Sequence, residues 1–121
     1  MSPPFIEFFL IQEAESVIRE PKASITNWTI IEVTFTDDTQ SNHLLGFVVG
    51  KKGRITSAIQ KFDCATKTIT TRSGRVYSLL GQPGSNRDIQ HLIAGWYYLD
   101  QIVKYKNVTD NYAKKIKSIV N

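Results

Sequence analysis

The stretch from His43 to Leu80 constrains the fold of this 121-residue chain more than any other. It reads HLLGFVVGKKGRITSAIQKFDCATKTITTRSGRVYSLL, in which short runs rich in β-branched residues alternate with tight turns that contain glycine and basic residues. Such runs, bounded by turn formers, are typical of β-strands joined in hairpins. The stretch therefore predicts a sheet of short consecutive strands, and the rest of the chain must pack around that sheet.

The alternation of side chains locates the expected strands. In residues 28–36 (WTIIEVTFT), Thr29, Ile31, Val33 and Phe35 fall on one face, and all four are apolar or β-branched, as a half-buried strand requires. The full set of expected strands is 28–36, 43–49, 54–62, 67–71 and 76–80, with the first two antiparallel. Turn signals about every eight to twelve residues predict an antiparallel meander of about five strands, an SH3-like or OB-like curled sheet whose closure into a barrel the sequence leaves open.

Helices are expected on both sides of this sheet. Apolar residues in 5–20 recur at helical spacing, and Pro21 would end such a helix, although Phe8–Ile11 alone also suits a buried strand. Near the C-terminus, a long apolar stripe predicts a helix over 86–105, and a second helix is expected from Asp110, capped by Thr109.

The resulting fold class is α+β, in a single domain over residues 1–121. It combines an N-terminal helix, an antiparallel meander of about five strands and two C-terminal helices packed on the sheet. A chain of this length can build one modest hydrophobic core without disulfides. Its single cysteine, Cys64, excludes an internal disulfide, so the chain needs no oxidising compartment.

The first residues match neither a signal peptide nor a membrane span. No lysine or arginine precedes Arg19, and Glu7 interrupts the apolar run 5–11, which is far shorter than the roughly 20 residues of a spanning helix. We therefore expect a cytoplasmic, bacterial protein that does not interact with membranes.

The net charge of +4 hides an asymmetry along the chain. Residues 1–50 hold two basic and seven acidic residues, whereas residues 51–121 hold thirteen basic and four acidic ones. This separation can steer a charged partner or let two copies meet head to tail, unless the fold mixes the two halves on one surface.

Basic residues gather at three places in the second half. They are Lys51/Lys52/Arg54, Arg72/Arg75 and Lys114/Lys115/Lys117. The first two groups lie in turns that emerge from the same end of a meander, where they would form a cationic rim able to contact phosphates or an acidic protein surface. The alternative is that these turns only keep the protein soluble.

Two resemblances touch the same stretch. The run VVGKKG at 48–53, followed by Ile59, resembles the GXXG signature of KH domains, in which such a loop joins two helices and clamps a nucleic-acid backbone. The chain departs from that family at Thr56, where an aliphatic residue is expected, and has LLGFVV in place of the preceding helix. A basic hairpin turn whose glycines supply positive φ is the alternative.

The second resemblance covers about a third of the chain. Thr56-Ser57, Asp63 and Thr71-Arg72-Ser73-Gly74-x-x-Tyr77-x-Leu79 form a pattern similar to one in small bacterial proteins that have no assigned function. It implies a bacterial β-meander and carries over no activity.

Aromatic residues suggest a possible protein interface. On the expected helix 86–105, Tyr98 and Tyr105 lie opposite the main apolar stripe, with Ile102 toward one flank. A helix that is apolar on two faces is either sandwiched or bears an interface. Packing against the last helix is the alternative to a partner or dimer contact.

Residues for catalysis are sparse, and no catalytic or metal-binding residue is predicted. His43 and His91 are far apart in the sequence, Cys64 lies in an expected turn, and no HExxH, CxxC, GxSxG or P-loop motif occurs. No cofactor is expected.

We therefore expect a non-enzymatic binding or regulatory protein, encoded by a bacterium or a mobile element, that occludes or bridges a macromolecular partner. A protein partner or a second copy is favoured. The alternative is a nucleic-acid-binding module that uses the basic turns, and a small enzyme is third.

Overall fold

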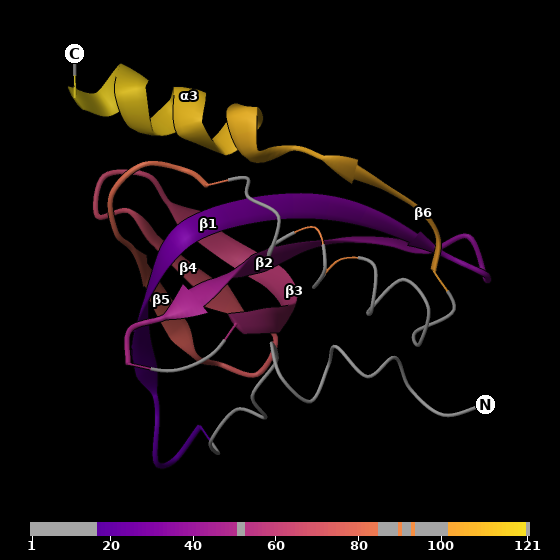
Figure 1. Cartoon of the computed structure of the whole chain (residues 1–121), viewed down its shortest axis with the longest axis horizontal. Helices are drawn as coiled ribbons and strands as arrows, with labels where there is room; N and C mark the ends of the chain where they lie inside the picture. Colours follow the sequence, from indigo (N-terminus) through magenta and orange to yellow (C-terminus); the bar gives the residue numbers. More distant parts are fainter. Residues whose placement is uncertain (1–16, 51–52, 85–89, 91–92, 94–101, 121) are drawn as a thin grey trace.

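The computed structural model describes residues 17–50, 53–84, 90, 93 and 102–120, without the side chains of 119 and 120. These residues form a curled sheet with a helix across one end (Figure 1). The elements are β1 (Lys22–Phe35), β2 (Gln40–Val48), β3 (Gly53–Asp63), β4 (Thr68–Thr71), β5 (Val76–Leu79), β6 (Ile102–Asn107) and α3 (Thr109–Val120).

Strands β1 to β5 close into a barrel because β1 pairs with both ends of the meander. It runs antiparallel to β2, from Ile25 opposite Val48 to Thr34 opposite Gln40. Its first four residues pair with β5 in parallel, starting with Lys22 opposite Val76. The closing pair has to be parallel because an odd number of strands in alternating directions returns to the direction in which it began.

A bend in β1 makes this double pairing possible. At Asn27 the backbone has a positive φ of 50°, and the register with β2 shifts between Thr26 and Thr29. A bulge of this kind bends a strand and increases its twist. Beyond the bend, β1 leaves β5 and pairs instead with β6, with Ile31 opposite Asn107 and Val33 opposite Tyr105.

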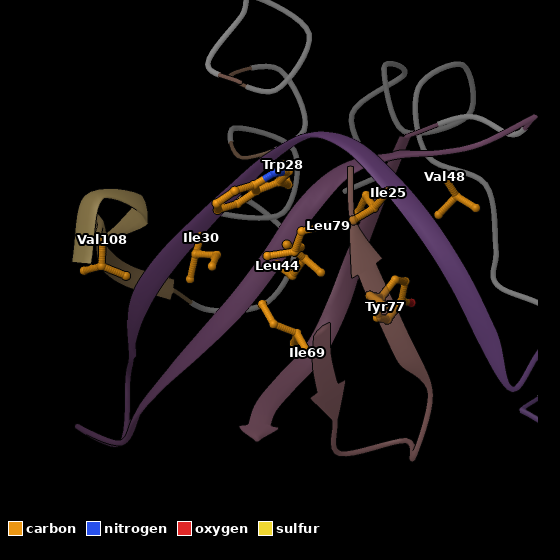
Figure 2. Packing of buried hydrophobic residues seen from close by; sticks show 9 residues of the cluster. All are labelled: Ile25, Trp28, Ile30, Leu44, Val48, Ile69, Tyr77, Leu79 and Val108. Carbon is orange, nitrogen blue, oxygen red and sulfur yellow. The ribbon is translucent and has the colours of Figure 1, made fainter. Parts of the chain in front are cut away.

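Strands β1 and β2 contribute to two apolar layers, because successive side chains of a strand point to opposite faces of the sheet. The larger cluster fills the barrel, where Figure 2 shows its side chains pointing into the space that the strands enclose. It consists of Ile25, Trp28, Ile30, Leu44, Val48, Ile69, Tyr77, Leu79 and Val108. The second cluster lies on the opposite face of β1 and β2 and consists of Ile31, Val33, Leu45, Ile93 and Ile102. Burial on both faces makes this strand pair the centre of the molecule.

The predicted strands correspond to β1 to β5, but β1 begins six residues before the predicted start at Trp28, and the predicted fold class is wrong. The described part of the chain is mostly β, its six-stranded sheet is mixed rather than antiparallel, and α3 is its one complete helix. The meander order β1 to β5 also differs from the Greek-key order of an OB-fold.

The helix predictions have three different outcomes. The one from Asp110 is confirmed as α3. The one over 86–105 is wrong at its end, because Ile102–Asn107 forms strand β6 along β1. Of the predicted N-terminal helix, residues 5–16 lie outside the described residues, and residues 17–19 form a turn.

Candidate binding surface at the α3 end of the barrel

Helix α3 is fixed across one end of the barrel by its first residues (Figure 1). Val108 is buried in the barrel cluster, and its N–H donates to the Ile30 carbonyl at 2.9 Å. The Thr109 hydroxyl accepts from the Ile30 N–H at 2.9 Å. Asn107 supplies the cap, since its Oδ1 accepts from the Thr109 N–H at 2.9 Å. The predicted cap, Thr109, is instead the residue that joins the helix to β1.

The apolar face of α3 closes this end of the barrel. The Tyr112 ring lies 4.9 Å from the Phe62 ring between centroids, and its hydroxyl accepts from Asn42 Nδ2 at 2.8 Å. Ala113 and Ile116 also pack on the barrel cluster. Contacts to two different strands set the rotation of α3 and thereby determine which of its residues face solvent.

This packing brings lysines from two distant segments together. Lys117 lies with Lys67 along one side of α3, and Lys115 lies with Lys61 along the other. All but Lys67 are exposed, and Lys67 is half-buried. Together with Lys114 on the helix, they form what we call the α3 basic surface: Lys61, Lys67, Lys114, Lys115 and Lys117.

Two acidic residues accompany these five lysines. The Asp63 carboxylate accepts hydrogen bonds from the N–H groups of Ala65 and Thr66, at 3.0 and 3.2 Å, and so supports the turn that carries Lys67. Asp110 lies in the first turn of α3, where the helix dipole favours a negative charge. The surface therefore keeps a positive excess around the end of the barrel.

The predicted basic turns meet at the opposite end. As expected from a meander, Arg54 and Arg75 come together there, but both are buried. Arg54 donates from NH1 to Glu20 Oε1 at 2.6 Å, and Arg75 Nε lies 3.2 Å from the same oxygen. Arg75 Nε also donates to the Glu20 carbonyl at 2.7 Å. The Glu20 carboxylate thus occupies the place between the two guanidinium groups that a phosphate would take.

The charge on Arg54 is maintained by this arrangement. Burial alone would lower its pKa, but hydrogen bonds to Glu20 and to the Tyr77 hydroxyl outweigh burial and hold the pKa above its ordinary value. Arg54 therefore remains a buried cation that completes the barrel end.

Of the other predicted phosphate contacts, the structure describes only Arg72. Arg72 is exposed in the turn between β4 and β5, at the same end as Glu20, and its phosphate contact stays a prediction. Lys51 and Lys52 lie outside the described residues. The GKKG segment joins β2 to β3 and so follows the hairpin alternative in its connectivity.

The predicted aromatic interface is partly described. Tyr98 lies outside the described residues. Ile102 is buried in the second apolar cluster, whereas Tyr105 is 47% exposed on β6, next to Val103 at 50%. The interface role of Tyr105 stays a prediction, whereas Ile102 packs in the core.

The described residues contain no group of three or more histidine, cysteine or acidic side chains that could hold a metal ion. His43 is buried on β2, where its ring nitrogens contact Ser41 Oγ at 2.5 Å and the Thr56 carbonyl at 2.9 Å. These contacts give His43 a structural role in joining β2 to β3.

The sequence indicated the group of lysines on α3 but not the two lysines that the fold places beside them. Lys61 and Lys67 stand alone in the sequence, more than 40 positions before Lys115 and Lys117. The sequence did contain one indication of their position. Lys61 and Lys67 lie on either side of the predicted turn between strands 54–62 and 67–71, and a helix packed on that end of the sheet would contact this turn.

Comparisons with known proteins identify no relative: no family model, curated protein or solved structure matches the chain. Among the residues that the structure describes, no helix has the length and apolar character needed to cross a membrane.

Proposed function

We propose that this protein is a non-enzymatic binding protein that contacts nucleic-acid phosphates through the α3 basic surface. The observation that supports the proposal is the convergence of Lys61 and Lys67 with Lys115 and Lys117 around one end of the barrel. A basic patch on one face, in a chain with an isoelectric point near 9.3, is the electrostatic pattern of a nucleic-acid-binding protein.

The rigidity of the surface strengthens the argument. The lysines of α3 are carried by a helix whose start is bonded to β1, and Lys61 and Lys67 flank the ordered turn after β3. Lysine ammonium groups act as point charges on phosphates, which gives affinity without base readout. Binding should therefore be weakly sequence-dependent and strongly salt-dependent.

Fluorescence anisotropy with labelled oligonucleotides of about 20 nucleotides tests this proposal at about 50 and about 200 mM salt. Three to five phosphate contacts predict a loss of affinity of roughly 50- to 500-fold between these conditions. Single-stranded DNA, single-stranded RNA and duplex DNA are titrated in parallel, because lysine contacts to phosphates do not depend on base identity and can form on all three. Absence of binding at the lower salt would refute the proposal.

Charge-reversal variants locate the contact. Lys61→Glu/Lys115→Glu should weaken binding at least about tenfold and flatten the salt dependence, since each lost phosphate contact lowers the salt slope by about one unit. The matched variant Lys22→Glu/Arg72→Glu changes the same charge on exposed residues at the opposite end. If this second variant weakens binding more than the first, the phosphate contact lies at the opposite end of the barrel, with the hairpin turns.

A second candidate is a protein partner or a second copy bound at β6. It is favoured by Val103 and Tyr105, which expose 50% and 47% of their surface on the last strand of the sheet order. Sedimentation velocity at low and high micromolar concentration would then show a dimer that Tyr105→Glu converts to monomer. A protein that stays monomeric throughout, with or without the substitution, would leave no support for self-association.

A further inference from the structure

A cavity of about 420 Å³ lies between α3 and the adjacent end of the barrel. Its apolar lining comes from Trp28, Pro83, Ala113 and Ile116. This volume falls within the range of small-molecule sites, which combine apolar walls with a few polar groups that fix orientation. The proposed contact with nucleic acid shares Lys67 and Lys117 with this cavity and leaves its apolar interior unassigned.

The loop that forms one wall is held in place by the barrel. The Trp28 indole N–H donates to the Gly81 carbonyl at 3.3 Å, and the Gly84 N–H donates to the Trp28 carbonyl at 3.0 Å. A Cβ on Gly84 would lie 2.6 Å from the Asn27 Cα, so the loop approaches β1 as closely as glycine permits. The wall is therefore formed before any ligand arrives, which reduces the entropic cost of binding.

The charged groups that line the cavity are both cationic. Lys67 comes from the turn between β3 and β4, and Lys117 comes from α3. The Lys67 carbonyl accepts from the Leu79 N–H at 2.9 Å, which fixes the backbone from which this side chain extends. No acidic side chain is among the described residues that line the cavity. An anionic group would thus meet two lysines beside an apolar space.

We propose that this cavity binds a small amphiphilic carboxylate. Its apolar chain would lie against Trp28, Pro83 and Ile116, and its carboxylate would pair with Lys67 and Lys117. Burial of the chain supplies the hydrophobic term, and the two ammonium groups supply charge-assisted hydrogen bonds. A neutral molecule with the same chain gains only the first contribution.

Titration of the full-length, ¹⁵N-labelled protein with octanoate and, separately, with octan-1-ol tests the proposal by NMR. Octanoate should cause saturable shifts at the Trp28 indole N–H and at the amides of Gly81 and Ala113. Octan-1-ol should bind at least about fivefold more weakly, because it lacks the charge that the lysines recognise. Equal affinity for the two compounds would overturn the proposal, as would shifts that never saturate or that spread over the whole barrel.

Lysine variants distinguish binding in this cavity from nonspecific binding. Lys67→Asn/Lys117→Gln should weaken octanoate binding about tenfold while affecting octan-1-ol little, and asparagine suits the positive φ of 57° at position 67. Lys104→Gln/Lys106→Gln, on exposed residues of β6 outside both the cavity lining and the α3 basic surface, removes the same charge and should leave octanoate binding unchanged. An equal loss in this control would mean that net charge, not the cavity, attracts the carboxylate.

A cavity-filling variant gives a second, independent test. Ala113→Phe should abolish saturable binding in a protein whose amide spectrum remains dispersed. If this variant fails to fold, the lysine variants still decide the question, because their side chains extend toward solvent. Loss of octanoate binding with retained nucleic-acid binding in Ala113→Phe, or the reverse in Lys61→Glu/Lys115→Glu, distinguishes this site from the proposed function.

Discussion

Asp37 shows how one exposed side chain organises a turn. It is the second residue after β1, and its Oδ1 accepts from the Thr39 hydroxyl at 2.6 Å and from the Thr39 N–H at 3.1 Å. The same turn is closed by the Phe35 N–H, which donates to the Thr39 carbonyl at 2.9 Å. These bonds favour the ionised carboxylate, and they lower the pKa of Asp37 below its ordinary value of 3.8.

The pH dependence that follows is confined to acid. Because the folded-state pKa lies below the unfolded one, the contribution of Asp37 to stability is present above about pH 4 and is lost as the pH falls through the folded pKa. A carboxyl ¹³C NMR titration should give a pKa below 3.8 for Asp37. In Thr39→Val, which removes the first of the two bonds, this pKa should rise. A wild-type pKa at or above 3.8 would contradict the assignment.

At the same scale, burial changes what a basic residue can do. Arg54 and Arg75 lie next to turns that contain other basic residues, which predicts a cationic rim. The side chains point inward because Glu20, more than 30 positions earlier in the chain, supplies the counter-charge. Buried guanidinium groups need such a partner, and a buried group that has one contributes little to surface recognition.

At the scale of elements, β6 and α3 are consecutive, and the first is a strand whereas the second is a helix. Ile102–Asn107 takes the free side of β1, and the chain then turns at Val108 into α3. The periodicity of Leu99 and Val103 is consistent with a helix, yet pairing with β1 provides hydrogen bonds that an isolated helix end would not have. Tertiary context therefore overrides a weak local preference, as it often does for short segments.

The pairing of β6 also accounts for the position of the lysines. Because Asn107 ends the strand and caps the helix, α3 leaves the sheet at the barrel opening and crosses it. If residues 102–107 had continued a helix, the lysines of α3 would have no fixed relation to the turn after β3. The α3 basic surface thus depends on where the strand stops.

At the scale of the whole molecule, the barrel is closed at its two ends by different chemistry. Apolar side chains of α3 cover one end, and the Arg54–Glu20–Arg75 cluster fills the other. Figure 2 shows the apolar interior that lies between them, from Val108 near α3 to Tyr77, whose hydroxyl contacts Arg54. Loss of the Glu20 carboxylate would remove a counter-charge that Arg54 and Arg75 share.

Glu20→Gln should therefore lower the free energy of unfolding by about 3 kcal/mol, the lower end of the cost of breaking a buried ion pair. The carboxylate is 12% exposed, which argues for that lower end. Urea denaturation measures the change, and Asp38→Asn, an exposed substitution at a positive φ that asparagine tolerates, should stay within about 0.5 kcal/mol of the wild type. Equal stability of Glu20→Gln and wild type would show that the cluster does not hold the barrel end.

The sequence by itself determined the local structure. Alternating side chains located β2 to β5 to within a few residues and the second part of β1, but not its first six residues. Glycine and polar residues marked the turns, and the apolar spacing after Asp110 predicted α3. These features depend on interactions between residues close in the chain, which a short window of sequence contains. The net positive charge of the second half is likewise a property of the sequence alone.

Only the tertiary structure decided how these elements close and which charges meet. The parallel pairing of β1 with β5 joins residues more than 50 positions apart, and so does the contact of Glu20 with Arg75. Such pairings are selected by the geometry of the whole barrel, because many partners are locally equivalent and the closed sheet has to pair backbone groups and buried charges at the same time. The same closure buried Arg54 and Arg75 of the predicted rim and gathered the lysines at the opposite end.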